Sequence, residues 1–206
     1  MNLYFSLLLI FVYGLTVSGQ TAEKPSGPDL ISLQPCEVPR ASEGAKEKVL
    51  CGTYEVFENR ALKSGSRISL KIIVFPATGK DKAADPLFYI PGGPGSSATE
   101  DAPYVAEEYA KIRERRDLVF VDQRGTGGSN PLNCDFFDPS DVQSYFGYWN
   151  PLDQVRKCRQ RLEAKSDLRL YVTSIAMDDL DDVRVALGYK KINISGGSYG
   201  TRATQE

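Results

Sequence analysis

Short apolar runs recur along this chain and predict the buried strands of a sheet. They lie at 86–90, 117–122 and 192–195. Longer, more polar stretches separate them. Apolar strands that alternate with helices are typical of a parallel sheet covered on both faces. The pattern therefore predicts an α/β fold with a mostly parallel sheet.

Three of the intervening stretches space their apolar residues as helices do. Two of these helices are expected near 104–113 and over 152–164. A third begins after Thr173 or Ser174, either of which could cap it, and ends before Gly188. Its apolar positions are Ala176, Leu180, Val183 and Leu187. These helices supply the cover that the predicted strands need.

Two segments nearer the N-terminus alternate apolar and polar residues with a period of two. They are Thr53–Phe57 and Arg67–Phe75, and Ser64–Ser66 lies in the connection between them. Alternation with β-branched residues around such a turn predicts an antiparallel hairpin. We expect this hairpin at one edge of the sheet.

The N-terminal residues Leu3–Val17 are almost all apolar, as in a signal peptide. We predict a signal peptide over 1–19 with cleavage before Gln20, although no Lys or Arg precedes the run. An uncleaved anchor and a buried cytosolic segment are the alternatives. Because the run is short and broken by polar residues, no stable membrane span is expected. The predicted location is secreted or periplasmic, followed by a flexible lead-in and disulfide loop over 20–50.

An exported chain with four cysteines favours disulfides, and four cysteines allow three pairings. The simplest pairing is Cys36 with Cys51 and Cys134 with Cys158, each closing a local loop. A zinc site is the rival interpretation. The sequence has neither a C-x-x-C pair nor any histidine, which argues against zinc.

Composition excludes several classes of protein. The chain has 206 residues, a formal net charge of −2 and 41% hydrophobic residues, as an ordinary globular protein does. No lysine–arginine block predicts nucleic-acid binding, and no P-loop or G-x-G-x-x-G motif predicts a nucleotide cofactor. We expect no cofactor and no metal. The acidic run at 178–182 resembles a metal cluster, but a solvated face in the early turns of the third helix is the preferred interpretation.

The candidate chemistry lies in Gly196–Gly200, which matches G-x-S-x-G after an apolar run. In this nucleophile elbow a sharp strand-to-helix turn holds the serine in strained dihedral angles and exposes its hydroxyl. Glycines two residues before and two after Ser198 are required because a Cβ there would collide with the neighbouring strand or the following helix. The alternative is a glycine-rich turn with an ordinary serine.

A serine nucleophile also needs oxyanion donors and a base. The backbone N–H of Tyr199 is one expected donor. The second should come from the loop 92–96, where Pro94 has no N–H; of Gly92, Gly93, Gly95 and Ser96 we favour Gly93. The base is missing, because the chain contains no histidine. In elbow-type hydrolases the acid and the histidine follow the serine, so both are expected beyond Glu206.

Three motifs occur together in this chain: PGGPG at 91–95, VDQRGTGGS at 121–129 and GGSYG at 196–200. This combination resembles the proline iminopeptidase branch of the α/β-hydrolases, especially its secreted tripeptidyl-aminopeptidase-like members. The likeness runs from about Cys36 to the end of the chain. It implies Ser198 as nucleophile and Gly93 and Tyr199 as oxyanion donors.

The same resemblance implies that Asp122 and Arg124 shape their loop through structural hydrogen bonds. The cytosolic iminopeptidases carry histidine where Pro91 stands here, which favours the secreted branch. Residues 51–206 are thus predicted to be the N-terminal part of an α/β-hydrolase domain that is incomplete at the C-terminus. A helix after the elbow needs about ten residues or more, but only six residues follow Gly200 in this sequence.

We therefore predict a secreted serine hydrolase, specifically an aminopeptidase that acts on peptides through an acyl-enzyme. These residues alone are expected to be inactive, since the acid and histidine are missing. An esterase acting on small esters is the alternative within the same class. A non-catalytic remnant or binding protein derived from the same fold is the alternative outside it.

Overall fold

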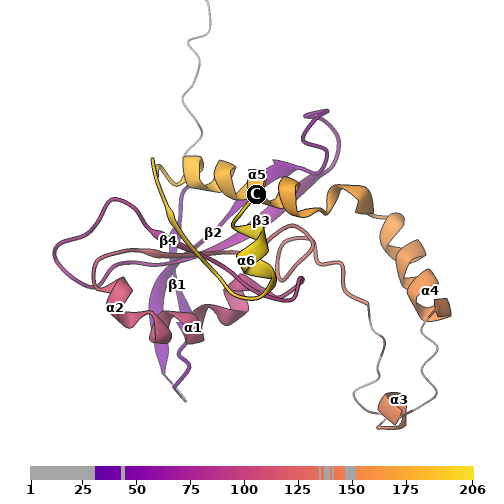
Figure 1. Cartoon of the computed structure of the whole chain (residues 1–206), viewed down its shortest axis with the longest axis horizontal. Helices are drawn as coiled ribbons and strands as arrows, with labels where there is room; N and C mark the ends of the chain where they lie inside the picture. The colour runs from indigo at the N-terminus through magenta and orange to yellow at the C-terminus, as the bar shows by residue number, and fades with distance from the viewer. Residues whose placement is uncertain (1–30, 43–44, 135, 137–139, 141, 147–151) are drawn as a thin grey trace, which may run out of the picture.

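A mixed six-stranded sheet forms the centre of the molecule (Figure 1). The computed structural model describes residues 31–42, 45–134, 136, 140, 142–146 and 152–206. The strand order is β1-β2-β3-β5-β4-β6. The strands are β1 (Gln34–Pro39), β2 (Lys46–Phe57), β3 (Arg67–Phe75), β4 (Leu87–Ile90), β5 (Leu118–Val121) and β6 (Asn193–Gly196).

The predicted α/β fold is confirmed, and its sheet is mixed. The β1–β2, β2–β3 and β3–β5 ladders are antiparallel, whereas β4 pairs in parallel with β5 on one side and β6 on the other. The mixture has a topological cause. Strands β1, β2 and β3 follow one another through short connections, which antiparallel pairing permits, whereas each parallel pair needs a crossover. The predicted hairpin at one sheet edge is present as β2 and β3, but β1 lies outside it.

Strand β1 was not expected, because the segment between Cys36 and Cys51 was predicted to be a polar loop. Instead β1 and β2 pair in register from Gln34 opposite Cys51 to Pro39 opposite Lys46. The segment is rich in charged residues and contains Pro39, so its alternation is hard to recognise. Of the side chains of β1, only Val38 is buried.

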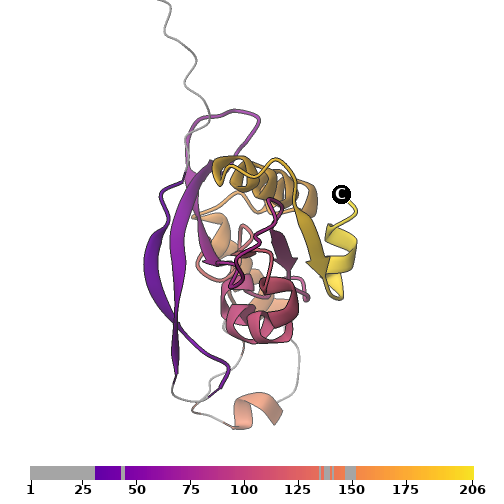
Figure 2. The same cartoon turned by 90° about the vertical axis from the view of Figure 1, so that its left-hand side faces the viewer.

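Helices cover both faces of the sheet, as predicted (Figure 2). One face packs against α5 (Thr173–Ala186) and α6 (Tyr199–Ala203), through Leu180, Val183 and Ala203. The other face packs against α1 (Ala98–Glu108), which α2 (Ala110–Arg113) follows. Helices α1 and α5 thus each bury one apolar stripe against the strands.

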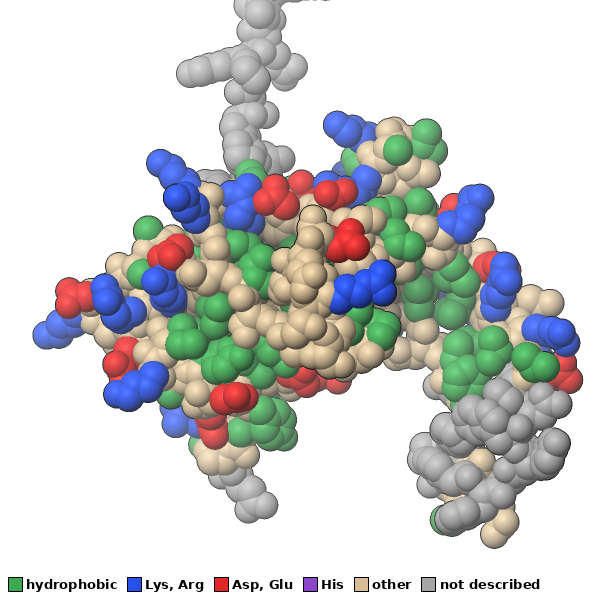
Figure 3. Space-filling model, viewed as in Figure 1, with side chains coloured by type: hydrophobic (Ala, Val, Ile, Leu, Met, Phe, Trp, Pro, Cys, Tyr) green, Lys and Arg blue, Asp and Glu red, His purple; other side chains and the backbone are tan. Residues whose placement is uncertain are grey.

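The central strands are buried, whereas β6 is not. Both β4 and β5 consist almost entirely of buried residues, as their apolar runs predicted. The prediction of a buried strand is wrong for β6, where Ile194 is 46% exposed. The reason is position: among the described strands, β6 pairs only with β4 and lies at the edge of the sheet. Hydrophobic side chains are exposed on the face that carries β6 and α6 (Figure 3).

Two helix starts differ from the sequence-based expectation. Helix α1 begins at Ala98, earlier than predicted, because the Ser97 hydroxyl caps it by accepting a hydrogen bond from Glu100 N at 3.1 Å. Helix α5 begins at Thr173, but Val172 is its N-cap residue and no side chain caps it. The Thr173 hydroxyl is instead 3.1 Å from the hydroxyl of Tyr199.

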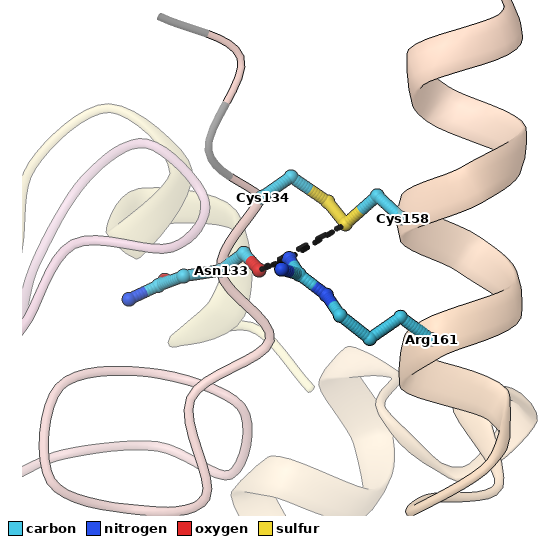
Figure 4. Close-up of a disulfide and its surroundings, with 4 residues drawn as sticks. All are labelled: Asn133, Cys134, Cys158 and Arg161. Atoms are coloured by element: carbon cyan, nitrogen blue, oxygen red, sulfur yellow. Dashed lines mark hydrogen bonds between the residues drawn. A yellow bond between two sulfur atoms is a disulfide. The ribbon is translucent and has the colours of Figure 1, made fainter. Parts of the chain in front are cut away.

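Both disulfides of the simplest predicted pairing are present, Cys36–Cys51 and Cys134–Cys158. All four cysteines are thereby used, so none remains as a thiolate ligand for zinc. The second disulfide joins α4 (Leu152–Glu163) to the loop after β5, and Arg161 of α4 donates a hydrogen bond to the Asn133 carbonyl at 3.0 Å (Figure 4).

Helix α4 confirms the helix predicted over 152–164, yet its apolar side chains Leu152 and Val155 are 60% and 44% exposed. Two short elements flank it, α3 (Gln143–Phe146) and the 3-10 helix η1 (Leu168–Leu170). Helix α4 is therefore joined to the rest of the fold mainly through the disulfide and the contacts around it.

The predicted signal peptide over 1–19 and the lead-in up to residue 30 lie outside the described residues. In the part of the chain that the structure describes, no helix is both long enough and apolar enough to cross a membrane.

Candidate active site

Ser198 lies at the sharp turn between β6 and α6. Its backbone angles are φ 51° and ψ −119°, a conformation that costs a non-glycine residue about 1–3 kcal/mol. Its side chain is exposed, and no described residue hydrogen bonds to its hydroxyl. The main chain after it turns at once into helix, with Thr201 N donating to the Ser198 carbonyl at 3.0 Å. This is the strained, outward-facing serine that the motif predicts.

The two outer glycines of the motif have no room for a side chain. A Cβ on Gly196 would lie 2.6 Å from the backbone carbonyl of Gly200 in the following helix. A Cβ on Gly200 would collide with the carbonyl oxygen of Ile90 in the neighbouring strand β4. The physical reason given for these glycines from the sequence is therefore confirmed. Gly197 differs, because a Cβ there meets nothing within 4 Å.

Replacing Gly200 with alanine should displace α6 from β4 and lower the free energy of unfolding by about 1–3 kcal/mol, as overpacking does. Gly197→Ala is the matched control, one residue before the serine, and should unfold like the wild type within about 0.5 kcal/mol. Urea denaturation of both variants measures the difference. Equal stability of the two variants would contradict the close packing at Gly200.

The glycine-rich loop after β4 lies against the serine. A Cβ on Gly92 would be 3.3 Å from Ser198 Cβ and 3.8 Å from Ser198 Oγ. Gly93 and Gly95 have φ angles of 109° and 107°, which favour glycine strongly. The loop backbone can thus approach a reacting group beside Ser198 more closely than side-chain-bearing residues would allow.

Asp122 fixes the end of this loop through hydrogen bonds. Its carboxylate is completely buried and accepts hydrogen bonds from the hydroxyls of Ser97 and Thr99 at 2.8 Å each. It also accepts from the backbone N–H groups of Thr99 at 2.9 Å and Gly128 at 2.8 Å. The end of β5 is in this way tied to the start of α1, and these are the structural hydrogen bonds that the resemblance implied.

Arg124 forms a buried ion pair that the sequence did not predict. Its Nε and one terminal nitrogen donate to the two oxygens of Asp179 at 2.6 and 2.9 Å. The other donors bind the carbonyls of Glu58, Leu170 and Phe57. All five N–H groups of the guanidinium thus have acceptors.

Asp179 corrects the interpretation of the acidic run as a solvated face, because its side chain is only 1% exposed. Arg60 also contacts it, at 2.9 Å. Burial raises the pKa of the Asp179 carboxyl above its ordinary value, and the Arg124 and Arg60 guanidiniums offset part of that effect. In a helix about one position in four faces the sheet, so one carboxylate of the run can be buried while the others face solvent.

A cleft of about 570 Å³ lies beside the elbow and is lined by Tyr199, the residue after the serine. It is lined by the loop that contacts Ser198, the loop after β5, the start of α5 and one side of α6. The lining residues include Pro94, Gly95, Gln123, Gly125, Thr126, Leu132, Tyr171, Thr173, Tyr199 and Arg202. A hollow of similar volume between η1 and α4 has mostly charged walls and none of these residues. The first cleft is the candidate substrate site because Tyr199, next to the predicted nucleophile, and the glycine-rich loop both line it.

Sequence analysis found the serine and the glycine loop, but it missed several of the cleft's polar side chains. Tyr171 is one of these, and burial raises the pKa of its phenol. It therefore remains a neutral hydrogen-bonding group at neutral pH. Gln123 and Arg202 are two more. No residue pattern distinguishes them before the loops are placed beside one another.

Comparison with known proteins finds curated serine peptidases of similar sequence. The chain is 31% identical over 213 residues to serine protease Hip1 of Mycobacterium tuberculosis, and the match covers 96% of this chain and 40% of that protein. It is also 31% identical over 169 residues to tripeptidyl aminopeptidase of Streptomyces lividans, covering 74% of this chain and 31% of that protein. The chain is similar to serine peptidases of the α/β-hydrolase type.

Within the α/β-hydrolases the curated relatives named above are serine peptidases, so the enzyme class predicted from the motifs is confirmed at the level of the family. The chain spans 40% and 31% of the lengths of these two relatives. Among solved structures, proline iminopeptidase of Mycobacterium smegmatis has a TM-score of 0.44 and 19% identity, covering 74% of this chain and 37% of that one. No protein-family model matches the chain.

Proposed function

We propose that this α/β-hydrolase chain carries the nucleophile and oxyanion hole of a secreted serine aminopeptidase. The observation that supports the proposal most strongly is the strained backbone of Ser198 at φ 51°, packed beside the glycine loop. A serine held in this conformation next to a cleft-lining residue costs stability without any structural return, which is typical of a nucleophile. The names of the curated relatives favour a peptide substrate.

In the proposed reaction Ser198 Oγ attacks the carbonyl carbon of the scissile peptide bond while a base takes its proton. The oxyanion that forms accepts hydrogen bonds from the backbone N–H groups of Gly93 and Tyr199. The C–N bond then breaks, the amine leaves with the proton, and the acyl group remains on Ser198 as an ester. Water hydrolyses this ester and restores the serine.

The base and its orienting acid are proposed to come from residues that follow Glu206 in the full-length protein. This chain has no histidine, and its relatives are more than twice as long. Residues 1–206 alone are accordingly proposed to be inactive. Two disulfides and the apolar N-terminal run support a secreted or periplasmic location.

A substrate panel on the full-length protein tests this function. We expect hydrolysis of tripeptidyl anilides with a free N-terminus, and at least about tenfold slower hydrolysis of the same anilides after N-acetylation, since that removes an ionic anchor of about 1.4 kcal/mol. Short-chain esters serve as the comparison. Hydrolysis of esters alone would support an esterase, and no hydrolysis of any member would support a non-catalytic binding protein.

A further inference from the structure

The amide side chain of Gln123 has an unused hydrogen-bond donor in the wall of the cleft. Gln123 directly follows Asp122 in the loop after β5 and is 9% exposed. It lines the cleft beside Ser198. Its Nε2 is buried and has no hydrogen-bond partner among the described residues, the only such side-chain nitrogen or oxygen found in that part of the chain. Buried donors are nearly always paired, so this one requires an explanation.

A hydrogen-bonded chain orients this amide. The hydroxyl of Tyr199, the residue that follows the serine, lies 3.1 Å from the Thr173 hydroxyl and donates to Gln123 Oε1 at 3.4 Å. If Oε1 accepts this bond, Nε2 is left as the free end of the chain. The amide is thus linked through one side chain to the backbone segment that carries the proposed nucleophile.

The backbone of Gln123 is fixed as well. Its two neighbours are the completely buried Asp122 carboxylate and the Arg124 guanidinium with five acceptors. Its own carbonyl accepts from Thr126 N at 3.0 Å and from the Thr126 hydroxyl at 2.9 Å. These contacts fix the main chain at Gln123, and among the described residues only the hydrogen bond from the Tyr199 hydroxyl orients its amide.

We propose that Gln123 Nε2 donates a hydrogen bond to a backbone carbonyl of the peptide bound in this cleft. This inference rests on the proposed function, which gives the cleft a peptide occupant. A peptide carbonyl is a neutral acceptor that suits a neutral amide donor, and it is present in every peptide regardless of side chain. Gln123 is therefore a substrate-positioning contact that holds the main chain while Ser198 attacks.

The test uses the full-length protein and the variant Gln123→Met, which keeps an unbranched side chain of similar volume and removes the donor. We expect kcat/KM for a tripeptidyl anilide to fall about 10-fold to 100-fold, because an acceptor in the substrate loses its partner. The rate of phosphonylation by a small fluorophosphonate, which has no peptide carbonyl, should change less than about threefold. Gln160→Met, the same substitution at an exposed position of α4 outside the cleft, is the matched control and should retain wild-type kinetics.

Two further readouts separate substrate contact from a structural role. The melting temperature of Gln123→Met should stay close to that of the wild type, because removal of an unpaired buried donor offsets the loss of the 3.4 Å contact between Oε1 and the Tyr199 hydroxyl. In a series of peptides with one carbonyl at a time replaced by a thioamide, wild type should lose rate at one position, and Gln123→Met should lose none there. That position identifies the carbonyl that is bound.

Three results would overturn the inference. Wild-type kinetics of Gln123→Met on every peptide would show that the donor has no substrate partner. Equal losses toward the peptide and the fluorophosphonate, together with a lower melting temperature, would assign Gln123 a structural role only. A wild-type protein that neither hydrolyses peptides nor reacts with the fluorophosphonate would overturn the proposed function and this inference together.

Discussion

Replacement of Ser198 by alanine in the full-length protein is expected to lower kcat by about ten-thousand-fold or more. In the proposed mechanism this hydroxyl forms the acyl-enzyme. The change removes a single exposed atom, so the fold should be unaffected. Steady-state hydrolysis of a tripeptidyl anilide measures the effect, and circular dichroism confirms that the variant is folded.

Ser198→Gly is the control that separates the hydroxyl from the backbone. It should be as inactive as the alanine variant, yet its melting temperature should match or exceed that of the wild type. Glycine adopts φ 51° and ψ −119° without the strain of about 1–3 kcal/mol, which offsets its entropic cost of about 0.5–1 kcal/mol. Activity within tenfold of the wild type in either variant would remove Ser198 from the mechanism.

Replacement of Asp179 by alanine is expected to lower the free energy of unfolding by about 3–5 kcal/mol, the largest stability effect that the structure predicts. The change leaves the Arg124 guanidinium buried without its anionic partner, and the side chains of both residues are 1% exposed. Removal of one member of such a pair costs far more than replacement of both. Urea denaturation, followed by circular dichroism, measures the loss.

Asp181→Ala is the matched control for this effect. It lies in the same helix and pairs with Arg184 at 2.6 Å, but its side chain is 64% exposed. Both substitutions change helix propensity equally, so their difference isolates the buried pair. We expect less than about 1 kcal/mol for Asp181→Ala. The double variant Arg124→Met with Asp179→Leu should recover part of the lost stability. Similar losses for Asp179→Ala and Asp181→Ala would contradict the account.

The parts of the fold that could be predicted are those where one physical requirement dominates the local sequence. Apolar runs identified β4 and β5, since strands buried on both faces tolerate little else. The strand β1 was missed because it is an edge strand with mostly exposed residues and two prolines. The exposure of β6 was missed because its composition is that of a buried strand, and only the strand order places it at an edge.

The same distinction between predictable and unpredictable features applies to the candidate site. Steric demands at the elbow are local, so Gly196, Ser198 and Gly200 could be recognised from three fixed positions. The pairing of Arg124 with Asp179 joins residues 55 positions apart, and nothing in an acidic run indicates which carboxylate faces inward. The unpaired amide of Gln123 is likewise a property of three loops that meet in space.

The most direct test of the account is to map the site at which a fluorophosphonate modifies the full-length protein. The reaction forms a bond from a serine oxygen to phosphorus and releases fluoride. Trypsin should release Ile192–Arg202 after cleavage at Lys191 and Arg202, and fragment ions distinguish Ser198 from Ser195 in this peptide. The account predicts one adduct per chain, at Ser198, with loss of peptidase activity in proportion. An adduct at another residue, or full activity after complete modification of Ser198, would contradict it.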